Sequence, residues 1–450
     1  MARVAVIGGG IAGLTAAYRL MKEGMVPVIF EASDRAGGVI RSERDGGFLF
    51  EHGPNSIQAS TDALETLVQN LDLVDARVSA SDAARVRYIV KDGVPVEAPT
   101  APHKLLSSEL FRAGAKLRLL REPFVPPADP EVEESVADFT RRRLGPDFLD
   151  YAMDPFVAGV YAGDPETLSV QHAFPSLYEM EQSAGSIIKG QISKRLDDTA
   201  AAETHRMFSF RNGLECLPRA LAEALAECLR PSAPVHRLHL HADGWTVHAR
   251  ESESAEVDAV VFAAPLHALR TLATPRSPHI PPLTDVDYPP LGVVALGYRR
   301  EHVHHPLDGF GLLVPRVESA FRILGTLFTS SIFPNRAPDG HVLLTTFIGG
   351  MRRPEMGTAP SVEAYGVVER DLTRLLDISG EPVLRKHVIW ERSIPQYTVG
   401  YASALDAMDR LEETWPGWFM AGNYRTGVSV GAAVDSGADA ARRCTTFLAS

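Results

Sequence analysis

The chain opens on RVAVIGGGIAGLTAAYRLMKEGMVPVIFE, residues 3–31, and this segment sets its architecture. Its first six residues form a β-branched run that is typical of a central parallel strand, buried on both faces. A glycine-rich turn at 8–13 follows at once, and a helix-forming segment then runs to Gly24, a natural helix stop. A second apolar run leads into the acidic Glu31. Strand, glycine turn, helix, strand and acid together predict a Rossmann-like dinucleotide-binding unit.

Each part of this segment has a physical task. Gly8 permits the tight turn, Gly10 lets the backbone approach a pyrophosphate, and Gly13 lets helix and strand pack closely. The N–H groups at the start of the helix then face the phosphates. Glu31, 18 positions after Gly13, can accept hydrogen bonds from a ribose hydroxyl. An ordinary glycine turn is the alternative, but it does not account for the strand, helix and acid at these spacings.

Composition and charge narrow the class of protein. The chain has 450 residues, 45% hydrophobic and 23% charged, which is typical of a soluble globular protein. Its formal net charge of −12 argues against a general nucleic-acid binder. Three cysteines with no zinc-binding spacing fit a reducing compartment. Without an apolar run of about 18 residues or a signal peptide, we expect a cytoplasmic protein that starts at residue 1.

A second phosphate-binding element follows the acid. Arg35-Ala36-Gly37-Gly38 places a cation before two flexible residues, so that backbone N–H groups and a guanidinium can close over a further stretch of phosphate. A solvated turn with a surface arginine is the alternative. This continuation resembles that of the two-dinucleotide-binding flavoproteins of the amine oxidase and protoporphyrinogen oxidase type, and the resemblance implies FAD as the cofactor.

The other end of the chain repeats the pattern of strand, turn and helix. Residues 418–437, WFMAGNYRTGVSVGAAVDSG, run from an apolar strand through a glycine-rich turn into a small-residue helix. In the flavoproteins just named, such a segment closes the flavin site. We expect the N–H groups of Val428 and Ser429, with the helix dipole, to stabilise negative charge on the reduced flavin. A plain surface helix with a flexible entry is the alternative.

Three segments between these ends are predicted to complete the nucleotide domain. Residues 234–250 indicate a β-hairpin that turns at Asp243-Gly244. Residues 256–270 indicate a buried strand, a small-residue turn and the start of a helix, and residues 208–227 a loop that leads into an amphipathic helix. The domain is therefore expected to be assembled from separated segments, with other domains inserted between them.

Four further blocks make the resemblance specific. Residues 50–56, 134–190, 321–350 and 390–401 resemble the flavin-proximal, helical, substrate-domain and penultimate blocks of plant-type protoporphyrinogen oxidases. The resemblance spans nearly the whole chain. It implies oxygen-dependent oxidation of protoporphyrinogen IX to protoporphyrin IX in haem biosynthesis, with hydride transfer to N5 of non-covalently held FAD and reoxidation by dioxygen to give hydrogen peroxide. The sister activity on coproporphyrinogen III is the alternative within the family.

The resemblance also implies the domain organisation. The fold class is α/β, with a discontinuous Rossmann-like FAD-binding domain, an α+β substrate-binding domain and an inserted α-helical domain. We predict the FAD-binding domain at 1–75, 206–268 and 390–450, and the substrate-binding domain at 76–99 and 269–389. The helical domain, which can associate with a membrane, is predicted at 100–205.

Site residues follow from the resemblance position by position. Arg87 is expected to pair with a substrate propionate, because a planar guanidinium binds a carboxylate bidentately. As the only obvious carboxylate anchor, it favours protoporphyrinogen over the more acidic coproporphyrinogen. Asn55 lies at the reacting end and orients the ring, and no side chain is assigned as a base. The implied tetrapyrrole contacts are Gly159, Leu307 or Phe310, Leu324 and Phe347. The implied FAD-binding residues are Gly8, Gly10, Gly13, Glu31, Arg35, Gly38, Gly53, Val235, Trp390, Gly427, Val428 and Ser429.

Two other classes of function fit parts of the pattern. One is an amine or polyene oxidase on the same fold, for which Tyr397 and Tyr424 could be taken as an aromatic pair beside the flavin. The other is a non-catalytic flavin- or porphyrin-binding carrier, which would consume no oxygen. No metal is expected, because the cluster His302, His304 and His305 lacks a completing ligand.

Partners are predicted partly from the resemblance and partly from a basic segment. The family implies a porphyrinogen, dioxygen and hand-over of the product to a downstream chelatase, and the sequence does not reveal the oligomeric state. Residues 101–127 form the one locally basic stretch and are predicted to be an amphipathic helix. This helix either lies in an anionic headgroup layer on the cytoplasmic side or packs on its own domain. Its cations are Lys104, Arg112, Lys116, Arg118 and Arg121, and its apolar face is Leu105, Leu106, Leu110 and Phe111.

Overall fold

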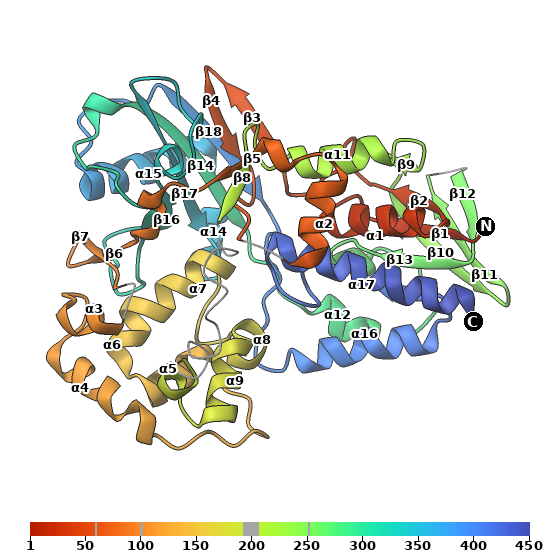
Figure 1. Cartoon of the computed structure of the whole chain (residues 1–450), viewed down its shortest axis with the longest axis horizontal. Coiled ribbons are helices and arrows are strands. Elements are labelled where there is room, and N and C mark those ends of the chain that lie inside the picture. The colour runs from red at the N-terminus through yellow and green to blue at the C-terminus, as the bar shows by residue number, and fades with distance from the viewer. Residues whose placement is uncertain (59–60, 100–101, 192–206, 251–252) are drawn as a thin grey trace.

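The computed structural model of the chain describes residues 1–58, 61–99, 102–191, 207–250 and 253–450. Figure 1 shows three regions: a parallel sheet with its helices on the right, a large mixed sheet at the upper left, and a group of helices at the lower left. Both chain ends lie on the right-hand region. The predicted fold class is confirmed, whereas the exact domain boundaries stay a prediction.

The right-hand region is built on a parallel sheet whose strands come from distant parts of the chain. Side chains of β1 alternate between two cores: Val4 and Val6 pack in the cluster that contains α1 (Ile11–Lys22) and α17 (Val430–Ala449), and Ala5 and Ile7 pack on the opposite face. In sheet order the strands are β19 (Trp418–Met420), β13 (Ala259–Phe262), β1 (Arg3–Ile7), β2 (Val26–Phe30) and β9 (Leu229–Arg230).

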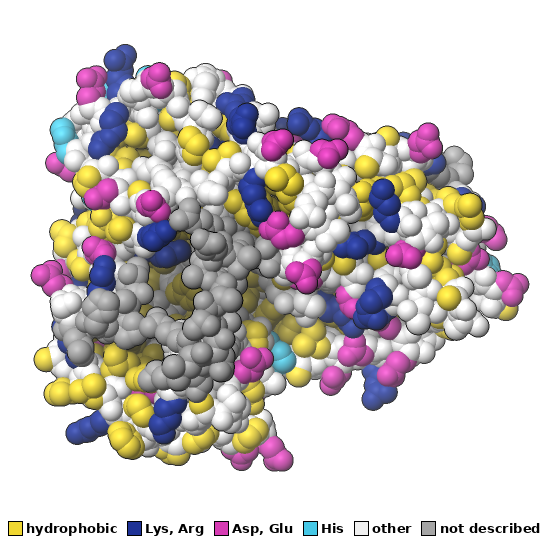
Figure 2. Space-filling model, viewed as in Figure 1, with side chains coloured by type: hydrophobic (Ala, Val, Ile, Leu, Met, Phe, Trp, Pro, Cys, Tyr) yellow, Lys and Arg dark blue, Asp and Glu magenta, His cyan; other side chains and the backbone are white. Residues whose placement is uncertain are grey.

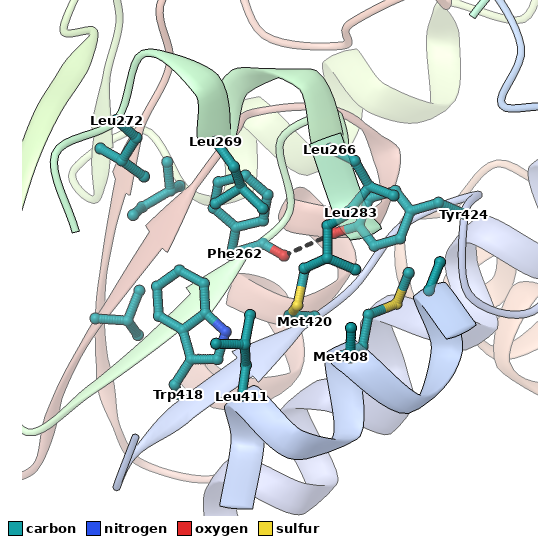
Figure 3. Close-up of a cluster of buried hydrophobic side chains, with 14 of the residues drawn as sticks. Phe262, Leu266, Leu269, Leu272, Leu283, Met408, Leu411, Trp418, Met420 and Tyr424 are labelled. Atoms are coloured by element: carbon teal, nitrogen blue, oxygen red, sulfur yellow. Dashed lines mark hydrogen bonds between the residues drawn. The ribbon is translucent and has the colours of Figure 1, made fainter. Parts of the chain in front are cut away.

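An aromatic core anchors the C-terminal segment to the second face of this sheet. Figure 3 shows Phe262, Trp418 and Met420 gathered with leucine and methionine side chains that include two from α16 (Ala402–Thr414). The Tyr424 hydroxyl donates to the carbonyl oxygen of Phe262 at 3.1 Å. Burying one large apolar side chain contributes about 1.5–3 kcal/mol. The cluster therefore holds the last strand and the turn after it firmly in place.

The connecting segments of this region agree only in part with their predictions. A hairpin is present as predicted, with β10 (Val235–His241) antiparallel to β11 (Gly244–Ala249), and β12 (Glu253–Val257) extends it. Its turn is one residue earlier than expected, because Gly244 already pairs with His241.

Two other predictions for these segments were wrong. Phe208–Phe210 is strand β8 rather than loop, because its two aromatic side chains are buried while its backbone pairs with β5 (Arg77–Ser79). The expected helix after β13 is only the short 3₁₀ helix Leu266–Arg270, and two prolines follow within eight residues. The amphipathic helix is present as α11 (Cys216–Ala224).

The upper-left region is a mixed sheet covered on one face by α15 (Ser361–Leu376). On the other face, Leu324 and Phe347 pack against α7 (Asp154–Tyr161). In sheet order the strands are β18 (Leu384–Trp390), β14 (Leu291–Arg299), β17 (His341–Gly349), β16 (Ile323–Leu327), β15 (Gly311–Leu313), β6 (Tyr88–Lys91) and β7 (Val94–Glu97).

The lower-left region is held together by a buried ion cluster. Arg143, Glu122 and Glu181 have fully buried side chains, and the Arg143 guanidinium contacts both carboxylates, at 2.8 Å for Glu122. Over the described residues, no helix combines the length and apolar character that crossing a bilayer requires. The main helices here are α3 (Pro102–Ser107), α4 (Ala113–Arg121), α5 (Val136–Arg143), α6 (Pro146–Phe148), α7, α8 (Val170–Ala173) and α9 (Pro175–Ala184).

The basic segment 101–127 is not one amphipathic helix. It divides into α3 and α4, and between them Leu110 and Phe111 are buried, with the Phe111 ring stacked on Phe148 at 4.1 Å. Half of the expected membrane face therefore packs on its own domain. The side chain of Leu106 lies outside the described part of the chain.

Candidate active site

The three glycines of the first turn meet different surroundings. Gly8 has φ +108°, a conformation that L side chains rarely adopt, and its amide donates to the Phe30 carbonyl oxygen at 2.8 Å. A Cβ on Gly13 would lie 2.0 Å from the Gly8 carbonyl oxygen, so helix and turn are in direct contact. A Cβ on Gly10 would have no neighbour within 4 Å. The backbone at Gly10 is thus open to a ligand, while its neighbours are packed.

Glu31 and the second glycine pair close over this turn. The Gly9 amide donates to Glu31 Oε2 at 2.6 Å, and the Ser33 amide donates to Oε1 at 2.8 Å. Gly38 approaches the first turn, because a Cβ there would lie 3.3 Å from Gly10 Cα. The Arg35 guanidinium donates to the Gly38 carbonyl oxygen at 2.7 Å. In this structure Arg35 therefore braces the loop.

The hairpin strand β10 begins beside Glu31. The Ala233 amide donates to the Glu31 carbonyl oxygen at 2.8 Å, two residues before Val235. Val235 is half-buried and packs at the edge of the core under the sheet. Val235 is thus placed near the acidic end of the cradle formed by the glycine turns and Glu31.

Strand β18 and the segment around Gly53 form a further wall of this cradle. The Trp390 indole N–H donates to the His52 carbonyl oxygen at 2.7 Å. A Cβ on Gly53 would lie 2.3 Å from the Val39 carbonyl oxygen, so this position has no room for a side chain. Asn55 donates from Nδ2 to the Gly53 carbonyl oxygen at 3.1 Å, while its Oδ1 is buried and has no partner among the described residues.

The last helix starts at the junction of the three regions. α17 runs from the middle of the molecule toward the C-terminus (Figure 1). Ser429 caps it by accepting the Ala432 amide at 3.0 Å. It crosses α1 at close range, because a Cβ on Gly437 would lie 2.2 Å from the Ala12 carbonyl oxygen. The Gly427–Ser429 turn is therefore held on the same side of the molecule as the first glycine turn.

These contacts fit a bound dinucleotide. The open backbone at Gly10 admits a phosphate. The carboxylate of Glu31 accepts the Gly9 amide and both the amide and the hydroxyl of Ser33, and it keeps one lone pair for a ribose hydroxyl. The unpartnered Oδ1 of Asn55 is an acceptor that the fold itself does not use. The two glycine-rich segments, one near each end of the chain, are brought together here by the contact between α1 and α17.

An apolar cluster adjoins this cradle. Leu324, Leu291 and the half-buried Phe347 pack with Ala158 and Ala162 of the α7 region. Leu291 of β14 is the cross-strand partner of Trp390 of β18, so the cluster lies on the strand next to the one that carries Trp390. A Cβ on Gly159 would lie 2.9 Å from Leu313, so α7 rests directly on the sheet.

The other predicted substrate contacts divide into two groups. The Arg87 guanidinium lies over the ring of the half-buried Phe310, 5.3 Å from its centroid. Leu307 is 3% exposed and belongs to the separate core under α15. Of the two positions proposed together, only Phe310 is thus placed beside Arg87.

Tyr397 and Tyr424 are core residues with satisfied hydroxyls. Tyr397 donates to the Asn423 carbonyl oxygen, and Tyr424 donates to that of Ala421 at 2.7 Å. Both are buried, which raises the pKa of each phenol well above its ordinary value. In this structure they do not form an open aromatic pair.

Sequence reasoning missed a pocket of about 220 Å³ beside Leu324. Arg316, Arg322, Arg352 and Arg353 line it, with Asp164 as its acid. The doublet Arg352-Arg353, one residue after the 321–350 block, was a signal for cationic character at this point. Its partners could not be found from the sequence, because they follow different strands.

Comparison with known proteins places the chain among flavoproteins. The model of the family described as flavin containing amine oxidoreductase matches residues 11–445. Mitochondrial protoporphyrinogen oxidase of Nicotiana tabacum is 37% identical, with 100% of this chain and 95% of the relative covered. Coproporphyrinogen III oxidase of Bacillus subtilis (strain 168) is 27% identical, with 99% and 98% covered.

Solved structures show the same fold. A candidate protoporphyrinogen oxidase from Exiguobacterium sp. 255-15 superposes with a TM-score of 0.84 at 23% identity, covering 100% of this chain and 99% of that one. Cyclohexylamine oxidase from Brevibacterium oxydans IH-35A superposes with a TM-score of 0.71 at 17% identity, with 100% of both chains covered.

Proposed function

The chain belongs to the protoporphyrinogen oxidase family within the flavin-containing amine oxidoreductases, and we propose that it oxidises protoporphyrinogen IX to protoporphyrin IX with FAD as cofactor and dioxygen as acceptor. The observation that carries the proposal is full-length similarity, at 37% identity, to a protoporphyrinogen oxidase. The geometry supports it through an apolar cluster that adjoins a dinucleotide cradle at Trp390.

The protein's share of the chemistry is to bind and orient the cofactor. The turn at Gly8–Gly13 would hold the pyrophosphate of FAD, and Glu31 would hold its ribose. With flavin bound, the N–H groups of Val428 and Ser429 and the positive end of the α17 dipole would stabilise negative charge on the ring. Bound flavin supplies the acceptor for a hydride and passes the electrons on to dioxygen.

Substrate is held by an apolar slot with few polar anchors. Leu324 and Phe347 contact the faces of the macrocycle, and Arg87 pairs with a propionate at one end. Asn55 orients the ring or a developing iminium through its free acceptor Oδ1. The slot excludes water from the transfer, and no side chain is needed as a base.

The test is turnover by the purified protein in air. We expect an oxidised-flavin spectrum, FAD released intact by acid precipitation, and porphyrin fluorescence that appears from protoporphyrinogen IX at a rate matched by oxygen uptake. Arg87→Ala should raise KM for the porphyrinogen more than it lowers kcat. Flavin binding without oxygen uptake would support the carrier instead, and turnover of benzylamine or polyamines would support an amine oxidase.

Coproporphyrinogen III is the second candidate substrate within the family. It is favoured by the similarity to a coproporphyrinogen III oxidase over 99% of the chain. The ratio of kcat/KM on the two porphyrinogens decides between them, and a clear preference for coproporphyrinogen would overturn our assignment.

We also propose that the enzyme acts in the cytoplasm at the membrane surface and passes its product to a chelatase. Figure 2 shows hydrophobic side chains at the surface of the lower-left region. Leu117, Leu120 and Phe124 are exposed there, on and beside the basic helix α4. An apolar face with cations beside it suits an anionic headgroup layer.

A further inference from the structure

The arginine pocket beside Leu324 is strongly cationic in a chain whose net charge is −12. Four guanidiniums and one carboxylate line it, and its walls come from three loops: the end of α7, the segment between β15 and β16, and the segment after β17. Charge of this sign and density in a pocket recruits an anion.

Two of the four arginines build the pocket. Arg352 donates to the Val314 carbonyl oxygen and to Asp154 Oδ2, both at 2.7 Å. Arg316 pairs with Asp164 at 2.8 Å. The Met351 amide donates to the Ala162 carbonyl oxygen at 2.7 Å. The three walls are thus tied together without any ligand.

The other two arginines are free to bind. Among the described residues, the guanidiniums of Arg322 and Arg353 make no hydrogen bond and no ion pair, although both line the pocket. Nε of Arg352, whose side chain is only 8% exposed, has no hydrogen-bond partner within the same part of the chain. Unused donors at this position favour a ligand with acceptor oxygens.

The pocket lies at the opposite end of β15 from Arg87. Leu324 belongs both to the pocket wall and to the apolar cluster with Phe347. Phe310, beneath Arg87, and Val314, at the pocket, are four residues apart across β15, roughly 13 Å of extended chain. Side chains alternate along a strand, so Arg87 lies on the same face of the mixed sheet as Ile89. Ile89 packs toward the helical region, and so does Leu324.

We propose that Arg322 and Arg353 form a second carboxylate-binding subsite, at the edge of the tetrapyrrole remote from Arg87. The inference rests on the proposed function and extends it. A porphyrinogen with carboxylates at both edges then engages both ends of the slot, whereas one with carboxylates at a single edge uses one end only. The subsite therefore determines how well coproporphyrinogen III, with its four propionates, is accepted beside protoporphyrinogen IX.

The experiment compares Arg322→Ala, Arg353→Ala and the double variant with the unaltered holoenzyme on both porphyrinogens. We expect the double variant to lose about tenfold or more in kcat/KM for coproporphyrinogen III, since a hydrogen bond to a charged group is removed at each position. The value for protoporphyrinogen IX should stay within about twofold. Arg322→Lys with Arg353→Lys keeps the charge and should restore part of the loss. Arg410→Ala on α16, an exposed arginine remote from the pocket, is the matched control.

A free phosphate could use the same donors, and a competition arm separates the two sources. Inorganic phosphate should inhibit coproporphyrinogen turnover in the unaltered protein and not in the double variant. The subsite would be overturned if the double variant left the ratio of the two kcat/KM values unchanged, which includes equal losses on both substrates. It would also be overturned if the unaltered protein did not turn over coproporphyrinogen. In each case, turnover of protoporphyrinogen leaves the proposed function standing. Phosphate inhibition with an unchanged ratio would reduce the pocket to a general anion site. Inactivity toward both substrates would overturn the proposed function and the subsite with it.

Discussion

The glycines of the first turn are subject to different steric constraints, although they are equivalent in the sequence motif. Gly13 is fixed by contact with the protein itself, since a Cβ there would meet the Gly8 carbonyl oxygen. Gly10 meets nothing within 4 Å and is required only when a ligand lies over it. The same residue type is therefore required by the fold at Gly13, whereas at Gly10 we propose that it serves the cofactor.

This difference predicts opposite behaviour of two alanine variants. Gly13→Ala should destabilise the protein by about 2 kcal/mol or more, because backbone must move to admit the methyl group. Gly10→Ala should change the stability of the flavin-free protein by less than about 0.5 kcal/mol but weaken FAD binding. Urea unfolding of the flavin-free protein and flavin titration measure the two effects. Equal loss of stability in both variants would contradict the assignment.

The buried imidazole of His52 predicts a pH dependence of stability. Burial lowers the pKa of His52 from its ordinary value, and it does the same for His267, His305 and His387. Between the lowered values and about 6.5 the unfolded chain binds more protons, so the free energy of unfolding falls as pH decreases through that interval.

Urea unfolding at a series of pH values between 7.5 and 5, roughly the range around the ordinary histidine pKa, measures the slope. His52→Gln should make it shallower than in the unaltered protein. His236→Gln, at an exposed position of β10, is the matched control and should leave the slope as it is. A slope that is the same in both variants would show that His52 does not contribute.

Among the elements, α4 and the residues before it show that the apolar pattern of a sequence does not determine which apolar side chains are buried. The residues expected to face a membrane include Leu110 and Phe111, which are buried, whereas the exposed apolar residues are Leu117 and Leu120. Periodicity reveals that a helix has an apolar face, but which neighbour covers that face depends on the tertiary packing.

The exposed face of α4 predicts membrane binding that charge substitution removes. Leu117→Glu with Leu120→Glu should lower the fraction bound to anionic liposomes by about tenfold or more, because two exposed leucines no longer enter the headgroup layer. Co-sedimentation with phosphatidylserine vesicles at low and high salt measures it. Val362→Glu, at an exposed apolar position on α15, should bind as the unaltered protein does. Undiminished binding of the leucine variant would exclude this face.

For the whole molecule, a buried ion pair joins two segments that are far apart in the sequence. Arg336, 2% exposed, follows α13 (Thr329–Ile332) in the mixed-sheet region and lies 3.4 Å from Glu51 of β4 (Phe48–Glu51). It also donates to the Ser209 hydroxyl of β8 at 2.6 Å. Burial raises the pKa of Glu51 despite the opposing charge of Arg336.

Removing one partner of this ion pair should lower the free energy of unfolding more than removing both partners. Arg336→Met leaves Glu51 buried and unpaired and should lower the free energy of unfolding by about 3–5 kcal/mol. Arg336→Met combined with Glu51→Gln should lose less than the sum of the single variants. Urea unfolding of the four proteins measures the coupling, with Arg410→Met as the exposed control. Strictly additive losses would show that the pair does not couple the two segments energetically.

The local elements of the nucleotide-binding region could be predicted from residues 3–31. Its strand, glycine turn and helix appear as β1, Gly8–Gly10 and α1, because each is specified by residue types at neighbouring positions. The same holds for the hairpin at 234–250 and for the last helix. Full-length resemblance then supplied the family.

The positions of side chains that converge from distant strands needed the folded chain. Leu307 and Phe310 are three residues apart, yet one lies in the core under α15 and the other beside Arg87. Arg322 and Arg353 line one pocket although 31 positions separate them. Short-range periodicity and turn chemistry are encoded along the chain, whereas which faces meet follows from how sheets and helices pack, and packing is a property of all the residues together.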